Sequence, residues 1–178
     1  MLSNTILIVV GGLPAAGKTT LSRLLAARIG AVHLRVDTIE QALVRSGLAR
    51  HPVGPAGYVV GYALAEEYLR QGLPVIAESV NPLAVTRDSW RDAGTRAGVP
   101  VVEVEVICSD PAEHRQRVAS RAVDLPDLPL PDWEEVRRRE YEPWNREHVT
   151  LDTAGDGPRE SLNSLLHRLD RLQLLPRR

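Results

Sequence analysis

Nine consecutive residues near the N-terminus have the types and spacing needed to hold a chain of phosphate groups. They are Gly12, Leu13, Pro14, Ala15, Ala16, Gly17, Lys18, Thr19 and Thr20, and the first eight match G-x-x-x-x-G-K-[ST]. Glycines at those places let the backbone curl so that successive N–H groups point at phosphate oxygens. The lysine places a positive charge on the β- and γ-phosphates, and the first threonine offers its hydroxyl to Mg²⁺. The pattern predicts a phosphate loop that binds ATP and Mg²⁺, with Lys18 also acting in catalysis.

Lys18 is the only lysine among the 22 Lys and Arg residues of the chain. A sequence that otherwise uses arginine has its one ammonium inside a glycine-rich loop, which favours a chemical role for it. Guanine-specific switch proteins read their base with N-K-x-D, and this chain lacks the second lysine for that motif. With 178 residues it is also too short for the large motor and transporter ATPases. The small kinases remain.

Two carboxylates stand where predicted strands end. Asp37 follows a strand at 31–36, and Glu78 ends a strand at 74–78. Phosphoryl transfer asks the protein to position its reactants, neutralise charge and accept the proton of the substrate hydroxyl. We assign the last role to Asp37, with an N-cap of the following helix as the alternative. Glu78 is predicted to hold Mg²⁺ through water or to act as the alternative base, and a buried glutamate there needs a partner.

A helix predicted at 111–121 carries Arg117 and Arg121, which are four residues apart and share one face. A proline-rich stretch at 124–132 follows, and then a second helix is predicted at 131–144. This arrangement fits a lid at about 115–140 that closes over ATP and stabilises the transferring phosphoryl group. We favour Arg117 or Arg121 for that contact over Arg137–Arg139. The alternative is a solvated basic helix face.

Candidate contacts to the acceptor come from four further residues besides Asp37, namely His51, Tyr58, Asn81 and Arg87. Arg87 would hold an anionic acceptor. Tyr58 also lies four residues before Tyr62, and that spacing more often reflects packing between helices than a ligand site. The acceptor itself cannot be named from these residues.

Short apolar runs alternate with longer helical patterns along the whole chain. Strands are predicted at 5–10, 31–36, 74–78, 101–108 and 148–152, and helices at 17–29, 38–46, 56–71, 83–97, 111–121, 131–144 and 158–172. Such alternation predicts an α/β fold with a parallel sheet that is covered by helices on both faces. We expect residues 1–178 to form a single domain.

The segments GGLPAAGKTTLSRLLA and LRVDTIEQAL resemble the P-loop kinases of small metabolites and antibiotics. This AAA-type group of kinases includes gluconate kinase, shikimate kinase and chloramphenicol phosphotransferase. The resemblance implies a three-layer P-loop NTPase fold with a five-stranded parallel sheet of order 2-3-1-4-5 and a helical lid. Its members often have Asp at the position of Glu78, so the glutamate is a departure that puts direct metal contact in doubt.

The composition indicates which partners and which cellular compartment to expect. A formal net charge of −1 does not suit a protein that coats nucleic acid or binds anionic membranes, and no apolar run reaches the roughly 20 residues of a membrane helix. A lone cysteine, Cys108, excludes an internal disulfide. We therefore expect a cytoplasmic protein with a small-molecule partner and no membrane; nucleic acid is disfavoured, and the oligomeric state cannot be read from the sequence.

The motifs together favour a small kinase that moves the γ-phosphate of ATP to a hydroxyl of a metabolite, nucleoside or antibiotic. One alternative is a nucleotide or polynucleotide 5′-end kinase, although a polynucleotide would want a basic channel. The other is a nucleotide-dependent switch with slow hydrolysis. The two acids at strand ends and the predicted lid favour transfer over switching.

Overall fold

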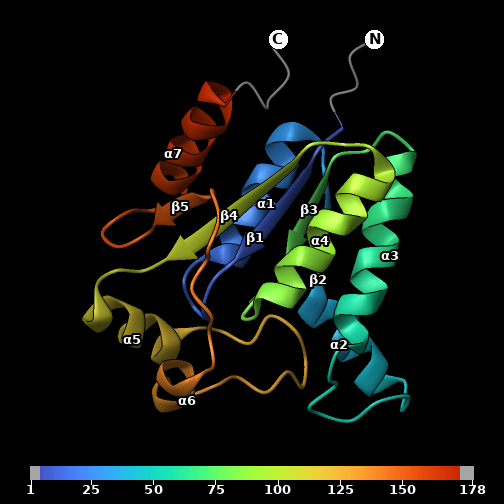
Figure 1. Cartoon of the computed structure of the whole chain (residues 1–178). Coiled ribbons are helices and arrows are strands. Elements are labelled where there is room, and N and C mark those ends of the chain that lie inside the picture. The colour runs from blue at the N-terminus through green and yellow to red at the C-terminus, as the bar shows by residue number, and fades with distance from the viewer. Residues whose placement is uncertain (1–4, 173–178) are drawn as a thin grey trace.

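The computed structural model of the chain describes residues 5–172 and shows one five-stranded sheet in that range (Figure 1). Its strands, all paired in parallel, are β1 (Leu7–Gly11), β2 (Val32–Arg35), β3 (Val75–Glu78), β4 (Val101–Ile107) and β5 (Val149–Asp152). Their order is β2-β3-β1-β4-β5. This confirms the predicted fold class and strand order. The single-domain prediction also takes in residues 1–4 and 173–178, which lie outside the described residues.

Helices cover both faces of the sheet and complete three layers (Figure 1). They are α1 (Lys18–Ile29), α2 (Val36–Arg45), α3 (Ala56–Arg70), α4 (Ala84–Ala97), α5 (Pro111–Ser120), α6 (Trp133–Arg138) and α7 (Pro158–Arg171). Alternate residues of β1 point to opposite faces. Ile8 packs in a core cluster with Leu25 of α1 and Leu165 of α7. Leu7 packs in the other, with Leu69 of α3. Apolar burial on both sides explains why β1 reads as a continuous hydrophobic run.

The second predicted strand is one residue too long at each end, and the difference at its carboxyl end changes the setting of Asp37. Strand β2 ends at Arg35 and α2 begins at Val36, so Asp37 lies inside the first turn of the helix. The N-cap position belongs to Arg35, and no side chain caps the helix there. The capping alternative for Asp37 is therefore wrong.

The helix predicted at 131–144 is also too long, because α6 ends at Arg138. Beyond it the chain packs on the inner strands of the sheet, where the Tyr141 hydroxyl donates to Glu105 of β4 at 3.1 Å. The Trp144 ring lies so close to Gly11 that a Cβ on this glycine would clash with it. These tertiary contacts override the local helical pattern of the sequence.

Helices α5 and α6 and the loop between them lie beyond the carboxyl ends of the strands, on the side opposite the start of β1 and the end of α7 (Figure 1). The loop is tied to the body of the protein by side chains. Asp124 accepts hydrogen bonds from Arg23 at 2.9 Å and from Arg35 at 2.6 Å. Gln41 of α2 donates to the carbonyl of Pro126 at 2.7 Å. The segment predicted to be a lid thus covers the end of the sheet where ligands are expected. Within residues 5–172, no helix combines the length and apolar character needed to cross a membrane.

Candidate active site

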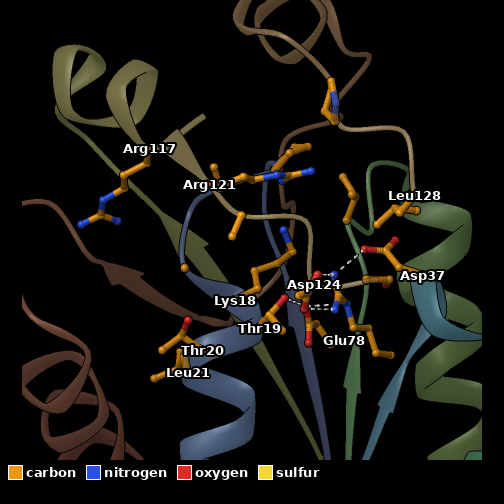
Figure 2. A pocket seen from close by; sticks show the side chains of 18 of the residues that line it. Lys18, Thr19, Thr20, Leu21, Asp37, Glu78, Arg117, Arg121, Asp124 and Leu128 are labelled. Carbon is orange, nitrogen blue, oxygen red and sulfur yellow. Dashed lines mark hydrogen bonds and ion pairs between the residues drawn. The ribbon is translucent and has the colours of Figure 1, made fainter. Parts of the chain in front are cut away.

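A cavity of about 900 Å³ opens beyond the carboxyl ends of the central strands. Its walls are the phosphate loop, the start of α2, residues 51–54, the end of β3 and parts of the segment 117–139. Figure 2 shows side chains from these separate elements pointing into one space, with Lys18 and Thr19 near its floor and Asp37 to one side. Residues far apart in the sequence therefore share one chamber.

The phosphate loop has a backbone shape that depends on its glycines. Gly12 has φ 140° and Gly17 has φ 101°, values that side chains rarely allow. A Cβ on Gly12 would also overlap the carbonyl oxygen of Val106. Gly17 precedes the 12-residue helix α1, and no side chain caps that helix end. The first N–H groups of α1 are thus left for an anion, as phosphate binding requires.

Lys18 is a buried cation, with only 8% of its surface exposed, and its Nζ donates to the Leu13 carbonyl at 2.8 Å. Burial lowers the pKa of Lys18 to about 8; the nearby Arg121 and Arg139 add to this, and Glu78 and Asp37 oppose it. The charges of Glu78 and Asp37 therefore offset only part of the cost of burying this ammonium. Phosphate oxygens would supply further negative charge, so the amine fits a bound nucleotide.

Glu78 is buried to 2% exposure and accepts a hydrogen bond from the Thr19 hydroxyl. Its other oxygen lies 2.7 Å from Nε2 of His33. Burial alone would raise the pKa of Glu78, but the hydrogen bonds of His33 and Thr19 and the charge of Lys18 together hold it below its ordinary value. The partner expected for this carboxylate exists, and Glu78 is poised to stay ionised.

The pairing of the Thr19 hydroxyl with the Glu78 carboxylate tests whether the residues fit Mg²⁺. Oxygen ligands of this kind suit Mg²⁺, which in nucleotide enzymes shares its coordination with phosphate oxygens and water. Between residues 5 and 172 no group of three or more His, Cys, Asp and Glu side chains could hold a metal ion alone. The residues fit a magnesium ion that is bound jointly with a polyphosphate.

Arg35 connects the two carboxylates predicted from the sequence. Its Nη2 donates to Asp37 at 3.3 Å, its Nη1 donates to Asp124 at 2.6 Å, and its Nε lies 3.8 Å from Glu78. Burial would lower the pKa of Arg35, but the hydrogen bond to Asp124 and the charges of Glu78 and Asp37 raise it instead. This guanidinium therefore stays charged and holds Asp37 at the cavity wall, where Asp37 remains partly exposed (Figure 2).

Glu40 is a cavity residue that the sequence analysis missed. It lies three residues after Asp37 on α2, a spacing that places both carboxylates on one helix face, and this signal was present in the sequence. Burial raises the pKa of Glu40 to about 7, the charge of Asp37 adds to this, and Arg139 opposes it. Glu40 thus stands beside Asp37 at the wall of the cavity.

The three arginines of the predicted lid that line the cavity occupy two regions. Arg117 donates to the hydroxyl and the carbonyl of Thr153, each at 2.7 Å, and is bound by Glu113. It therefore lies against the loop after β5, to one side of Lys18 (Figure 2).

Arg121 and Arg139 instead lie near Lys18 and lower its pKa. Burial lowers the pKa of Arg121 despite the opposing charge of Asp37, the strongest of the charges around it. Arg139, ranked behind Arg117 and Arg121 from the sequence, faces the same chamber as Arg121 because α6 ends before it.

Two predicted acceptor contacts lie outside the cavity, which corrects their assignment. Arg87 is 1% exposed, donates to the carbonyls of Asn81, Glu142 and Pro143, and stacks on the Trp144 ring at 4.9 Å. Asn81 is fully buried, and its Oδ1 accepts from Trp90 at 3.0 Å. The polar groups of both residues therefore bind other parts of the same chain and are not available to an acceptor.

The remaining two acceptor candidates have different surroundings. His51 lines the cavity, where its Nε2 lies 3.1 Å from Oε1 of Gln41. Tyr58 does not line it. Its hydroxyl accepts from the Asn81 backbone N–H at 3.3 Å, and its ring packs 6.1 Å from the Tyr62 ring. The packing alternative describes this tyrosine better than a ligand contact.

Comparison with protein families gives one match that spans most of the chain. A family model described as an AAA domain matches residues 7–143, which include every residue of the phosphate loop, α2 and the segment 117–139. A comparison with curated proteins finds no match.

Solved structures share the fold over almost the whole chain. An assumed kinase from Chloroflexus aurantiacus j-10-fl is 22% identical with a TM-score of 0.74, covering 96% of this chain and 99% of its own. A sugar kinase from Janibacter sp. HTCC2649 is 15% identical with a TM-score of 0.69, covering 97% and 99%. The Mycobacterium tuberculosis APS kinase, solved with AMPPNP and APS, is 16% identical with a TM-score of 0.67, covering 93% and 98%. At such identities these likenesses show the fold, which agrees with the resemblance drawn from the sequence.

Proposed function

Because the chain belongs to the AAA domain family and has the P-loop kinase fold, we propose that it is an ATP-dependent small-molecule kinase. It transfers the γ-phosphate of ATP to a hydroxyl of a small acceptor such as a metabolite, a nucleoside or an antibiotic. The observation that carries the proposal is the meeting of the Lys18 amine, the Thr19–Glu78 pair and the Asp37 carboxylate in one cavity.

The residues divide the work of phosphoryl transfer, which consists mainly of positioning and charge neutralisation. The backbone N–H groups of residues 12–19 and the Lys18 ammonium hold the phosphates. Thr19, and Glu78 through water, would hold Mg²⁺. When bound, Mg²⁺ supplies positive charge at the phosphate oxygens. Arg121 and Arg139 neutralise the remaining charge from the opposite side of the chamber.

Asp37 orients the acceptor hydroxyl and takes its proton. The geometry suits this role because Asp37 faces the cavity just beyond the carboxyl end of β2, while Glu78 is bound by Thr19 and His33. Arg35 holds Asp37 in place from behind. Of the two acids considered as base, the buried and fully partnered Glu78 is the poorer acceptor of a substrate proton.

Arg117 serves the far end of the cavity. Its guanidinium is tied to Thr153, whose hydroxyl also donates to the carbonyl of Ala16 in the phosphate loop at 2.9 Å. This end lies away from Asp37 and suits the nucleoside part of ATP. The segment 115–140 is a lid that excludes water when both substrates are bound.

The test is a screen of hydroxyl compounds for acceptor-stimulated ADP release, with each product checked for the added mass of one phosphoryl group. We expect at least one acceptor to raise ADP release well above the rate without acceptor. The Lys18→Met variant is the control and should show no stimulation. ATP hydrolysis that no acceptor stimulates would favour the nucleotide-dependent switch and contradict the proposal.

A further inference from the structure

Glu40 differs from the other carboxylates around the cavity because no donor on the described part of the chain binds it. Glu78 is bound by Thr19 and His33, and Asp37 by Arg35. Among residues 5–172, no side chain or backbone N–H forms a hydrogen bond or ion pair with Glu40, although it lines the cavity. Leaving a half-buried carboxylate without a donor costs free energy. The position suits a donor that arrives with a ligand.

The fold holds Glu40 against the cavity wall from behind. A Cβ on Gly57 of α3 would overlap the side chain of Glu40, so the backbone of α3 stands directly against it. The titratable and charged groups facing Glu40 are Asp37 on its own helix, Tyr58 on α3, and Arg139 beyond α6. Arg139 attracts the carboxylate without forming an ion pair with it. Because the backbone of α3 blocks one side of Glu40, its side chain cannot rotate toward α3 to reach a partner there.

Ser79 supplies a second and independent unsatisfied group in the same cavity. It follows Glu78 at the end of β3, is 4% exposed and lines the cavity. Its hydroxyl is fully buried and has no hydrogen-bond partner on the described residues. It lies beside the hydroxyl of Tyr58. Burial raises the pKa of Tyr58 and the Ser79 hydroxyl lowers it, but the two hydroxyls form no hydrogen bond of good geometry. A serine hydroxyl both donates and accepts, and a rotation about the χ1 torsion of Ser79 would turn this closed-off group toward a ligand next to Glu40.

Apolar side chains also line this cavity, and Leu128 lies close to Asp37 (Figure 2). Pro52 and Val53 come from the loop before α3, and Leu128, Pro129 and Pro131 come from the lid loop. The polar groups Asp37, Glu40 and Ser79 belong instead to α2 and β3. A ligand that suits both sets of residues has adjacent polar groups on a compact carbon frame.

We propose that Glu40, together with Ser79, binds a second hydrogen-bond donor of the acceptor, next to the hydroxyl that Asp37 deprotonates. The acceptor class is then a compound in which the reacting hydroxyl has a neighbouring hydroxyl or protonated amine: a vicinal diol or an amino alcohol. This inference rests on the proposed kinase function, because it concerns the acceptor end of the same cavity. Glu40 sets specificity and takes no proton from the reacting hydroxyl.

The pH dependence of the acceptor KM distinguishes an amine donor from a hydroxyl donor. Glu40 has its pKa raised to about 7 by burial and by Asp37. A protonated amine needs the ionised carboxylate, so the KM of an amino alcohol falls as the pH rises from 6 to 8. A neutral hydroxyl binds either form, and the KM of a diol stays nearly constant over that range.

The experiment uses matched trios of compounds on three carbon frames, with ATP and MgCl₂. The trios are cyclohexanol, trans-1,2-cyclohexanediol and trans-2-aminocyclohexanol; 2-propanol, 1,2-propanediol and 1-amino-2-propanol; and 1-phenylethanol, 1-phenyl-1,2-ethanediol and 2-amino-1-phenylethanol. Phosphorylated product is measured by ³¹P NMR and mass spectrometry. We expect the diol or the amino alcohol of at least one trio to have a kcat/KM more than 10-fold above that of its mono-alcohol, because a site built for a donor rejects the analogue that lacks it.

Variants locate this preference at Glu40. Glu40→Ala should raise the acceptor KM at least 10-fold and remove the preference, while the KM for ATP and the kcat at saturating acceptor change little. Glu40→Gln keeps a hydrogen-bond acceptor, so it should retain a diol preference but lose an amino alcohol preference. Glu67→Gln is the matched control, since Glu67 is exposed on α3 away from the cavity.

Two outcomes would overturn the inference in different ways. Equal turnover of mono-alcohols, diols and amino alcohols, unchanged in Glu40→Ala, would remove the role of Glu40 and leave the kinase function standing. No phosphorylated product from any trio, while ATP still binds, would count against the kinase function and the inference together.

Discussion

The phosphate loop and the acceptor end of the cavity meet between Lys18 and Asp37, yet the chain builds them by different means. The phosphate loop consists of eight consecutive residues, and its binding groups are backbone N–H groups held by two glycines with positive φ. The proposed acceptor end consists of side chains from α2, β3, the loop before α3 and the lid loop. One site is local in sequence and the other is assembled by the fold.

The difference teaches where specificity can change. A backbone cradle binds any chain of phosphates and tolerates few substitutions, because a Cβ on Gly12 would overlap Val106. Side chains on separate elements can be exchanged one at a time without rebuilding the sheet. The acceptor end is therefore the part in which a kinase of this fold acquires its own substrate.

The largest expected effect separates binding of phosphate from stability of the fold. Lys18→Met should lower turnover at least about 1,000-fold, since the charge on the phosphates is lost. The same change should raise the free energy of unfolding of the nucleotide-free protein at pH 7 by about 2 kcal/mol, because the buried ammonium has a pKa of about 8 in place of 10.5. Chemical denaturation measures this.

The sign of that stability gain follows from the direction of the pKa shift. Below pH 8 the lysine is charged in both states, so the folded protein bears the full cost. As the pH rises from 8 to 10.5 the folded state loses its proton first, and the cost disappears. The advantage of Lys18→Met should shrink over this range, and an advantage that stays constant to pH 10.5 would mean that Lys18 is not a buried cation.

The next effect concerns the acceptor end alone. Asp37→Asn should leave ATP affinity within about twofold and lower phosphoryl transfer about 100- to 1,000-fold, the usual range for loss of a general base. Nucleotide binding by calorimetry and product formation with the identified acceptor measure the two effects. Near-normal transfer by Asp37→Asn would show that another group takes the proton.

Variants of Arg121 and Arg117 compare the two ends of the cavity that the lid covers. Arg121→Ala should lower kcat about 10- to 100-fold with a small change in the KM for ATP, because this guanidinium lines the cavity near Lys18, where we propose that the phosphoryl group is transferred. Arg117→Ala should mainly raise the KM for ATP, since Arg117 is held at Thr153. Steady-state kinetics of both variants decide this, and a reversed pattern would exchange the two roles.

A smaller effect reports on Glu40 without any ligand. A carboxyl group whose pKa rises from 4.5 to about 7 on folding destabilises the folded protein above pH 7, and this cost fades as the pH falls toward 4.5. Glu40→Gln should therefore be about 1 kcal/mol more stable than the parent at pH 8, after allowance for solvent screening at this partly exposed site. The two proteins should unfold alike near pH 4.5. A difference that does not depend on pH would contradict the prediction.

The smallest expected effect concerns the tie between the lid loop and the body. Asp124→Asn weakens the ion pairs with Arg23 and Arg35, which are partly exposed, so it should cost less than about 1 kcal/mol. Hydrogen exchange of residues 121–132 should become faster, and more so at low salt, where the pairs are stronger in the parent. Unchanged exchange would show that Gln41 and the prolines hold the loop without Asp124.

Much of the fold was predictable because its signals are local. The apolar run of β1, the alternation of strands and helices and the G-x-x-x-x-G-K-[ST] pattern each arise from neighbouring residues. The strand order followed from the resemblance rather than from the pattern itself. The end of α6 was predicted wrongly, because the packing of Trp144 on Gly11 depends on a strand more than a hundred residues away.

The candidate site divides in the same way. Lys18, Thr19 and Asp37 stand out from the sequence because their types and positions carry the chemistry. The partners of Glu78 required the sheet, since the register of β2 and β3 places His33 beside Ile76, two residues before Glu78. Arg87 and Asn81 appeared suitable for an acceptor, but a buried polar side chain is drawn to unsatisfied backbone groups, and only the folded chain shows where those lie.

The sequence by itself determined that the chain binds phosphate groups through a backbone loop with one ammonium, because that site is made of adjacent residues. Only the tertiary structure decided which side chains line the rest of the cavity, since Glu40, Ser79 and Arg139 reach it through the packing of α2 on α3, the end of β3 and the early end of α6. A side chain has the same identity on any fold. Its exposure, its neighbours and its charge state are set by packing.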